Sequence, residues 1–167
     1  FILYFISINW DNKMLKRGVY AASLSVLNKD LTLNVEATIS HGEYLIKNGC
    51  TGVFFFGSTG ASQLLTLREK KEFISKIASH KLRKQFFFGT GCNSLYDNID
   101  LINYAMEYEF RDFLIMPPAY YKGNTDKGVF EFYSKTLQMS TENISASILF
   151  ISLAALLQLY LILELMN

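Results

Sequence analysis

The sequence predicts an α/β fold in which helices connect neighbouring strands of a parallel sheet. Three observations predict it: short apolar runs recur along the chain, amphipathic helical stretches separate them, and strand starts are spaced by about 30 residues, the size of one βα unit. The four apolar runs cover residues 18–25, 53–56, 86–88 and 113–116. The last three are continuously apolar, which is typical of strands that are buried on both faces. Four such units indicate either an open doubly wound sheet or part of a (β/α)8 barrel, and both folds place their chemistry at the carboxyl ends of the strands.

The intervening helices are predicted by apolar or small residues that recur every three or four positions and therefore share one face. The first stripe consists of Val35, Ile39, Gly42 and Ile46, and the third of Leu95, Ile99, Ile102 and Met106. The helix between them begins at a capping box, because Thr66 and Glu69 have the spacing at which their side chains satisfy each other's backbone N–H groups. A fourth helix is predicted over residues 126–140, with one side formed by Val129, Tyr133 and Leu137.

Composition excludes several classes of protein. Half of the residues are hydrophobic and 19% are charged, so the chain has enough apolar surface for a core and is not intrinsically disordered. A net charge of +1 implies no basic face for nucleic acid. Two cysteines (Cys50, Cys92) and two histidines (His41, His80) are too few for a disulfide framework or a zinc cluster. We therefore expect reduced thiols in a cytoplasmic protein, with neither a metal nor a cofactor.

The two ends of the chain differ from its middle. Residues 1–13 precede Met14, lack the pattern of a secretory signal, and are expected to be an upstream extension. From Asn143 to Leu163 the chain has no charged residue, and this stretch reaches the length of about 20 apolar residues that a membrane span requires. Serine and glutamine residues dilute the stretch, and no Lys or Arg flanks it. A membrane helix is therefore one interpretation of this segment.

Two glycine-rich loops follow the second and third predicted strands. Gly57-Ser58-Thr59-Gly60 sets two hydroxyl groups in a tight turn whose backbone N–H groups suit a carboxylate or a phosphate. It lacks the ending of a P-loop and the dinucleotide-binding fingerprint, and an ordinary βα turn explains it equally well. Gly89-Thr90-Gly91 follows the third strand, and we favour a structural turn there, with Asn93 or Ser94 capping the next helix.

A proline pair ends the fourth predicted strand, and a tyrosine pair follows it. The segment reads Pro117-Pro118-Ala119-Tyr120-Tyr121. One tyrosine can pack against the protein while the other offers its phenol to a substrate or a proton relay. From the residues alone, packing is the favoured role for both.

In this order, the motifs resemble those of the dihydrodipicolinate synthase/N-acetylneuraminate lyase family, the pyruvate-dependent class I aldolases. The family pattern of Gly-Thr-Thr-Gly-Glu, Leu-Thr-x-x-Glu, Gly-Thr-Gly and Pro-Tyr-Tyr corresponds here to residues 57–61, 65–69, 89–91 and 118–121. The resemblance covers residues 18–140 and implies a (β/α)8 TIM barrel with lyase activity of the aldolase type. It further implies a lysine that forms a Schiff base with pyruvate or a related 2-oxo acid, and assembly as a homotetramer.

The resemblance also assigns roles to particular residues. Ser58 corresponds to a hydroxyl of the proton relay and is a catalytic candidate. Ser58 and Thr59, together with Gly57 and Gly60, would bind the carboxylate of the 2-oxo acid. Tyr121 corresponds to the tyrosine that one subunit lends to its neighbour's site, and it is the second catalytic candidate.

Four residues at three places depart from the family pattern. Ser58 replaces a threonine and keeps the hydroxyl, Ala61 replaces a glutamate, and Ser25-Val26 stands where many members have Thr-Pro. These departures favour a sugar-acid or uncharacterised branch of the family over the lysine-biosynthesis branch.

The second half of the family pattern does not occur in this sequence. There is no Tyr-Asn-x-Pro segment and no lysine after Lys135, so no residue matches the Schiff-base nucleophile. We therefore expect residues 14–142 to form the N-terminal four βα units of a TIM barrel, incomplete and catalytically inactive as given. For residues 143–167, an apolar tail foreign to the family, we favour a frameshift or truncation over a membrane helix or a helix that covers the half barrel.

Two alternatives to an enzyme remain open. A non-catalytic fragment or pseudoenzyme would bind a 2-oxo acid or dock on a full-length homologue. A membrane-tethered half barrel is motivated by the uncharged tail alone.

Overall fold

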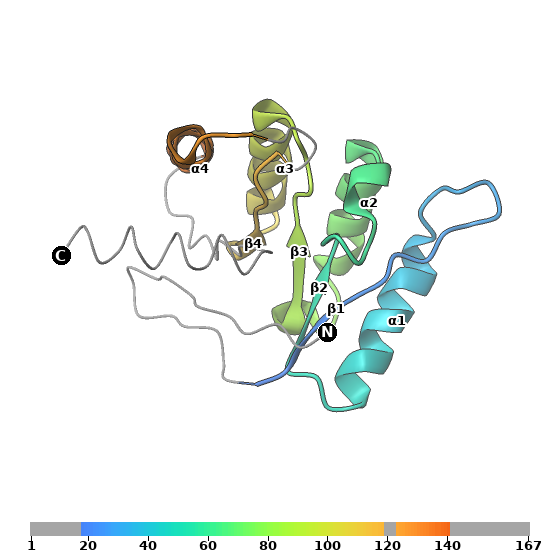
Figure 1. Cartoon of the computed structure of the whole chain (residues 1–167). Helices are drawn as coiled ribbons and strands as arrows, with labels where there is room; N and C mark the ends of the chain where they lie inside the picture. Colours follow the sequence, from blue (N-terminus) through green and yellow to red (C-terminus); the bar gives the residue numbers. More distant parts are fainter. Residues whose placement is uncertain (1–17, 119–122, 141–167) are drawn as a thin grey trace.

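Within the part of the chain that the structure describes, four parallel strands form one sheet in the order β1-β2-β3-β4 (Figure 1). The computed structural model describes residues 18–118 and 123–140. The strands are β1 (Tyr20–Ala22), β2 (Gly52–Phe55), β3 (Phe86–Gly89) and β4 (Phe113–Leu114). A doubly wound sheet reverses its strand order at a switch point, whereas a barrel adds strands in sequence. The observed order therefore selects the barrel from the two folds that the sequence predicts.

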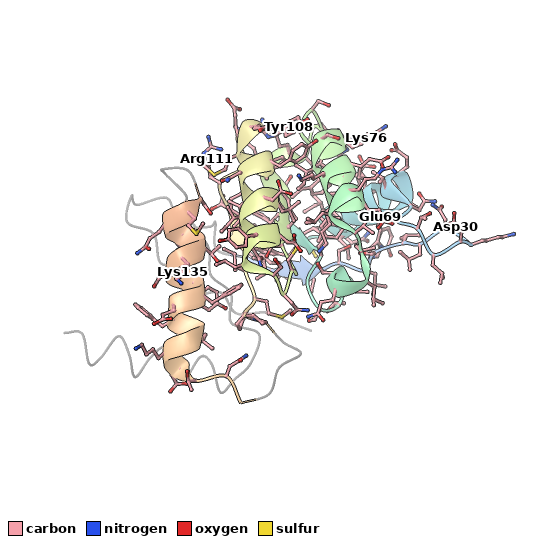
Figure 2. All side chains as sticks on the ribbon, turned by 90° about the horizontal axis from the view of Figure 1, so that it is seen from above. Asp30, Glu69, Lys76, Tyr108, Arg111 and Lys135 are labelled. Carbon is pink, nitrogen blue, oxygen red and sulfur yellow. The ribbon has the colours of Figure 1, made fainter. Side chains whose placement is uncertain are left out.

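A helix follows each strand and packs beside the helix before it. The helices are α1 (Val35–Lys47), α2 (Leu67–Ile77), α3 (Leu95–Glu107) and α4 (Asp126–Met139), with short 3-10 turns η1 (Ser62–Leu64) and η2 (Arg83–Gln85). Seen from above, they follow one another across the molecule in chain order (Figure 2). This is the arrangement of the outer helix layer of a (β/α)8 barrel.

The sheet buries apolar side chains on both of its faces. Alternate residues of a strand point to opposite faces, so Phe55 and Phe88 belong to a cluster that includes residues of all four helices. A second cluster lies on the other face and consists of Tyr20, Phe54, Phe87 and Leu114. The rings of Phe54 and Phe87, which are partners in the sheet, stack with their centroids 4.9 Å apart. The prediction of strands buried on both faces is therefore confirmed.

The helix starts follow the local signals of the sequence. Thr66 and Glu69 form the expected capping box: the Thr66 hydroxyl accepts from the Glu69 N–H group at 3.2 Å, and the Glu69 carboxylate accepts from the Thr66 N–H group at 2.8 Å. Ser94, one of the two expected caps, accepts from the Asp97 N–H group and caps α3. Each cap joins residues three apart, so it needs no tertiary contact to form.

Four local expectations are wrong, one of them being the fourth strand, which covers Phe113–Leu114 and not the whole of 113–116. The first strand covers Tyr20–Ala22 and not the whole of 18–25. Phe56, expected at the end of the second strand, leaves the strand with φ +58°. On α4, Leu137 is 36% exposed and Thr136 is buried beside Tyr133 instead. The Thr136 hydroxyl donates to the Phe132 carbonyl at 2.8 Å, and this intrahelical bond allows a polar residue to occupy the buried side.

The expectations for residues 1–13 and 143–167 lie outside the described residues. Within the part that is described, no helix has both the length and the apolar character to cross a membrane.

Candidate functional site

A tight turn at the carboxyl end of β2 is the centre of the candidate site. The Gly60 N–H group donates to the Gly57 carbonyl at 3.1 Å, and the Ala61 N–H group donates to the Ser58 carbonyl at 3.1 Å. The side chains of Ser58 and Thr59 are exposed at this end of the sheet, as a ligand-binding role requires. The four residues predicted to bind a carboxylate thus form one continuous turn.

The turn lies between two residues in a backbone conformation that L-amino acids rarely adopt. Phe56, before it, has φ +58°, and Ala61, after it, has φ +50°. Such conformations cost about 1–3 kcal/mol each and persist where the surrounding structure holds them. Phe56 is fully buried, so the packing of its ring fixes the entry into the turn.

The segment after β1 also contributes to the site. The Ser25 hydroxyl donates a hydrogen bond of 2.6 Å to the Gly60 carbonyl. A Cβ atom at Gly60 would lie 3.0 Å from the Ser23 carbonyl oxygen and 3.1 Å from the Phe56 nitrogen, so glycine allows the close approach. Sequence reasoning treated Ser25 only as a departure from the family pattern and missed this contact with the turn.

The loop after β3 packs against the same turn. A Cβ atom at Gly89 would lie 2.5 Å from the Phe56 carbonyl oxygen, and one at Gly91 would lie 1.8 Å from the Ser62 hydroxyl oxygen. Gly91 also has φ +55°, which favours glycine. The two glycine-rich motifs, separate in sequence, therefore form one packed unit at the carboxyl edge of the sheet.

A buried lysine lies beneath this unit. Lys70 of α2 is 1% exposed, and its Nζ atom donates to the Thr90 carbonyl at 2.8 Å and to the Cys92 thiol at 3.7 Å. Burial lowers the pKa of Lys70, against the opposing effect of Cys92 and nearby carboxylates. Burial raises the pKa of the Cys92 thiol, and the Lys70 ammonium opposes that rise. Sequence reasoning missed Lys70, although its position on the same stripe as Phe73 and Ile77 was a signal of burial.

The predicted juxtaposition of Ser58 and Tyr121 stays a prediction. Tyr120 and Tyr121 fall in residues 119–122, outside the described part of the chain. Pro118 lies just before that segment and Asn124 just after it. The Pro118 carbonyl accepts a hydrogen bond of 3.2 Å from the Asn124 side-chain amide.

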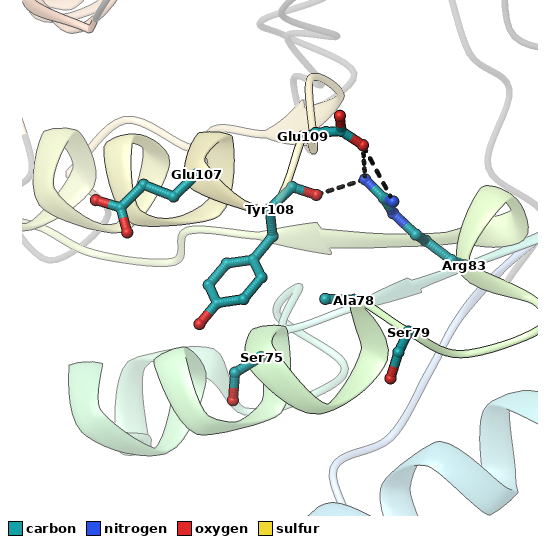
Figure 3. Close-up of a pocket in the computed structure, with 7 residues that line it drawn as sticks. All are labelled: Ser75, Ala78, Ser79, Arg83, Glu107, Tyr108 and Glu109. Carbon is teal, nitrogen blue, oxygen red and sulfur yellow. Dashed lines mark hydrogen bonds and ion pairs between the residues drawn. The ribbon is translucent and has the colours of Figure 1, made fainter.

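A pocket of about 420 Å³ lies at the other end of the sheet, between the carboxyl ends of α2 and α3 (Figure 3). There the Arg83 guanidinium donates to the Tyr108 carbonyl and lies 3.4 Å from the Glu109 carboxylate. In a (β/α)8 barrel this end contributes to stability and the opposite end carries the chemistry. The ion pair is exposed on its carboxylate side, and we regard the pocket as a structural feature.

Comparison with known proteins shows to which protein family this chain belongs. Residues 15–147 match the sequence model of the dihydrodipicolinate synthetase family. A relative from Chloroflexus aurantiacus named "Uncharacterized DapA-like lyase" is 27% identical over 118 residues, which are 70% of this chain and 40% of that protein. The 4-hydroxy-tetrahydrodipicolinate synthase of Methanococcus vannielii is 32% identical over 107 residues, 64% of this chain and 37% of that protein.

A solved structure agrees with this assignment. The dihydrodipicolinate synthase of Agrobacterium tumefaciens superimposes with a TM-score of 0.67 at 27% identity, covering 74% of this chain and 44% of that one. The class is that of proteins built on the (β/α)8 barrel of the dihydrodipicolinate synthases. This chain belongs to the dihydrodipicolinate synthetase family. It spans about 40% of the length of the curated relatives it matches, and its fold is part of the barrel.

Proposed function

We propose that this chain contributes the carboxylate-binding part of an aldolase-type lyase that acts on pyruvate or a related 2-oxo acid. The observation that carries the proposal is the Gly57–Gly60 turn at the carboxyl end of β2, with Ser58 and Thr59 exposed on it. Backbone N–H groups and hydroxyls in one tight turn are donors suited to a carboxylate. YagE of E. coli K12, which shares the fold, was solved in complex with pyruvate, and this supports the choice of ligand.

In the proposed site the carboxylate of the 2-oxo acid is bound by the turn, and the Ser58 hydroxyl serves a proton relay. Formation of an imine from a ketone and an amine expels water, so a hydroxyl group near the carbonyl must pass a proton to the leaving oxygen. Tyr121 would extend the relay into the site of a neighbouring copy. The proposed enzyme is therefore a homo-oligomer, a tetramer by analogy with the family.

The nucleophile of the proposed reaction is a neutral amine. No lysine follows Lys135 in the sequence, and Lys70 is buried with its Nζ atom bonded to the Thr90 carbonyl. We infer that these 167 residues by themselves supply the carboxylate-binding turn without the Schiff-base lysine. On their own they bind the 2-oxo acid and do not convert it.

Pyruvate binding and imine trapping test the two parts of the proposal separately. Titration of ¹³C-pyruvate followed by NMR is expected to show binding that weakens in Ser58→Ala and Thr59→Val. Ser79→Ala, an exposed serine at the opposite end of the sheet, is the matched control and should bind like the wild type. Borohydride treatment with pyruvate should leave the chain unmodified. A stable adduct of pyruvate mass would contradict the second part, and binding unaffected by both turn variants would contradict the first.

The alternative function is that of a non-catalytic partner of a complete homologue. It is favoured by the same combination of an intact turn with no matching nucleophile. Co-expression with a full-length family member, followed by purification through a tag on this chain, is expected to recover both proteins if the alternative is right. Recovery of this chain alone would remove it.

A further inference from the structure

Lys70 occupies a buried position on α2 where an apolar side chain would be expected. Among the described residues it is the one charged side chain that is buried, and its neighbours on the stripe, Phe73, Ile74 and Ile77, are fully buried. An ammonium group loses its hydration on burial, and only good hydrogen bonds compensate for that loss. The groups that accept hydrogen bonds from the Lys70 ammonium must therefore compensate for its lost hydration.

Those groups belong to one loop, the Gly89–Cys92 loop at the carboxyl end of β3. Lys70 Nζ donates to the Thr90 carbonyl at 2.8 Å and to Cys92 Sγ at 3.7 Å. The Cys92 thiol donates to the same Thr90 carbonyl at 3.1 Å. The Asn98 side-chain amide donates to the Cys92 carbonyl at 2.8 Å from α3. The loop is thus anchored from α2 by the lysine and from α3 by the asparagine.

The anchored loop in turn supports the Gly57–Gly60 turn. Gly91 faces the Ser62 hydroxyl and Gly89 faces the Phe56 carbonyl, each so closely that a Cβ atom would not fit. Phe56 precedes the turn and Ser62 follows it, so the loop touches the turn at both of its ends. A shift of the loop would therefore disturb the left-handed Phe56 directly and the left-handed Ala61 through the adjacent Ser62.

We propose that Lys70 is a positioning residue for the carboxylate-binding turn: its buried ammonium fixes the Gly89–Cys92 loop, and the loop fixes the turn. This inference rests on the proposed function for the identity of the ligand. The chain of contacts itself stands on the geometry of Lys70, Thr90, Gly91 and Ser62.

Two neighbouring lysines provide a matched pair of variants. Lys70→Met removes the ammonium while keeping a long apolar side chain. Lys71→Met makes the same change at the next residue, where the ammonium lies 2.8 Å from the exposed Asp100 carboxylate. In Lys70→Met, amide hydrogen exchange of residues 58–62 and 90–94 is expected to accelerate about tenfold, as for the loss of one hydrogen bond to a charged group. Exchange within α1 should be unchanged, and Lys71→Met should match the wild type in all three regions.

Unchanged exchange in both loops of Lys70→Met would overturn the inference. If the methionine variant unfolds as a whole, Lys70→Arg becomes the deciding variant, because arginine keeps a cation with donors for the Thr90 carbonyl. It is expected to restore the wild-type exchange pattern of both loops. An arginine variant that folds with both loops accelerated would overturn the inference as well.

The pH dependence of Cys92 alkylation tests the charge of Lys70 separately from the packing of its side chain. In a Cys50→Ser background, the pH profile of Cys92 alkylation should shift to higher pH in Lys70→Met, because the cation that stabilises the thiolate is gone. Asp97 and Asp100 act on Cys92 in the opposite sense, and Glu69 and Asp97 act on Lys70. These carboxylates are present in both lysine variants, so a shift of equal size in Lys71→Met would overturn the assignment.

Pyruvate binding completes the test. An approximately tenfold weaker affinity in Lys70→Met, with wild-type affinity in Lys71→Met, is the expected result for loss of one charged hydrogen bond. Accelerated loop exchange with unchanged pyruvate affinity would overturn the positioning role. If the wild-type protein binds no pyruvate, the proposed function fails, while exchange and alkylation still decide whether Lys70 holds the two loops.

Discussion

The Ser25 hydroxyl donates a 2.6 Å hydrogen bond to the Gly60 carbonyl across 35 residues of sequence. This contact joins the segment after β1 to the turn after β2. It fixes the last residue of the turn at a place where an added Cβ atom would lie 3.0 Å from the Ser23 carbonyl oxygen. The shape of the candidate carboxylate site therefore depends on a serine that is not itself part of the turn.

Replacing Ser25 with alanine should weaken the turn without disturbing the core. We expect the free energy of unfolding to fall by about 1 kcal/mol, the usual net value of one hydrogen bond, and pyruvate affinity to fall several-fold. Ser25→Thr keeps the hydroxyl and should behave as the wild type in both measurements. Chemical denaturation and ¹³C-pyruvate titration check the two values. Equal pyruvate affinity in Ser25→Ala and wild type would show that the bond does not shape the site.

Gly91→Ala should be the more destabilising of two glycine substitutions with a left-handed backbone. At Gly91 the added Cβ atom meets the Ser62 hydroxyl at 1.8 Å and φ is +55°. At Gly49 φ is +100° and nothing lies within 4 Å of the added atom, so Gly49→Ala measures backbone strain alone. We expect about 1 kcal/mol for Gly49→Ala and about 3 kcal/mol or more for Gly91→Ala by thermal or chemical unfolding.

A double variant separates the two causes at Gly91. Ser62→Gly removes both side-chain atoms that the new methyl group would meet. Combined with Gly91→Ala, it should recover the steric part of the loss and leave the strain part. A double variant whose loss equals the sum of the two single losses would mean that the packed contact between the loops is not what glycine preserves.

Glu69 should give the protein a stability that disappears in acid. Partial burial raises the pKa of Glu69, but hydrogen bonds from the Thr66 hydroxyl, the Leu33 N–H group and the Thr66 N–H group outweigh it and hold the pKa below its ordinary value of 4.5. At pH values between the folded-state and unfolded-state pKa of Glu69, the folded state therefore binds fewer protons than the unfolded state. Stability contributed by Glu69 is present above pH 4.5 and is lost as the pH falls through the folded-state pKa.

The variant Glu69→Gln tests this dependence by chemical denaturation between neutral pH and pH about 3. We expect it to be about 1 kcal/mol less stable than the wild type at neutral pH, and the difference to shrink on acidification. Glu72→Gln, an exposed glutamate on the same helix, is the control and should show no such trend. A constant difference at all pH values would assign the role of Glu69 to shape and not to charge.

Asn98→Asp should destabilise the protein more at neutral pH than in acid. Asn98 is fully buried, and its side-chain amide donates to the Cys92 carbonyl at 2.8 Å and to the Ser94 carbonyl at 2.7 Å. A carboxylate at this position has no proton to donate, so its hydrogen bonds to the Cys92 and Ser94 carbonyls are lost and a new charge is buried. We expect a loss of about 3 kcal/mol at neutral pH in chemical denaturation.

Protonation of the new carboxyl group returns one donor, so the loss relative to the wild type should decrease below the pKa of that group. The exposed Asn93 provides the control, because Asn93→Asp makes the same chemical change in contact with water. An Asn98→Asp protein as stable as Asn93→Asp at neutral pH would contradict the assigned hydrogen bonds.

Local sequence patterns predicted most strands and helices of this protein and two of its helix caps. The apolar runs located three of the four strands within two residues, and the capping residues Thr66 and Ser94 marked where helices begin. These features depend on interactions within one turn of helix or along one strand, so the local sequence contains them in full. The motif order also sufficed to identify the family.

Tertiary structure decided which residues meet at the site. Ser25 reaches Gly60, Lys70 reaches Thr90, and Gly91 reaches Ser62, over separations of 35, 20 and 29 residues. Each contact exists because β1, β2 and β3 lie side by side in the sheet and bring their carboxyl ends together. Periodicity and capping contain no information on strand order, so the sequence indicated the motifs without indicating that they form one packed unit. The strand order of the sheet sets which loops become neighbours, and the glycines of those loops then allow the close approach.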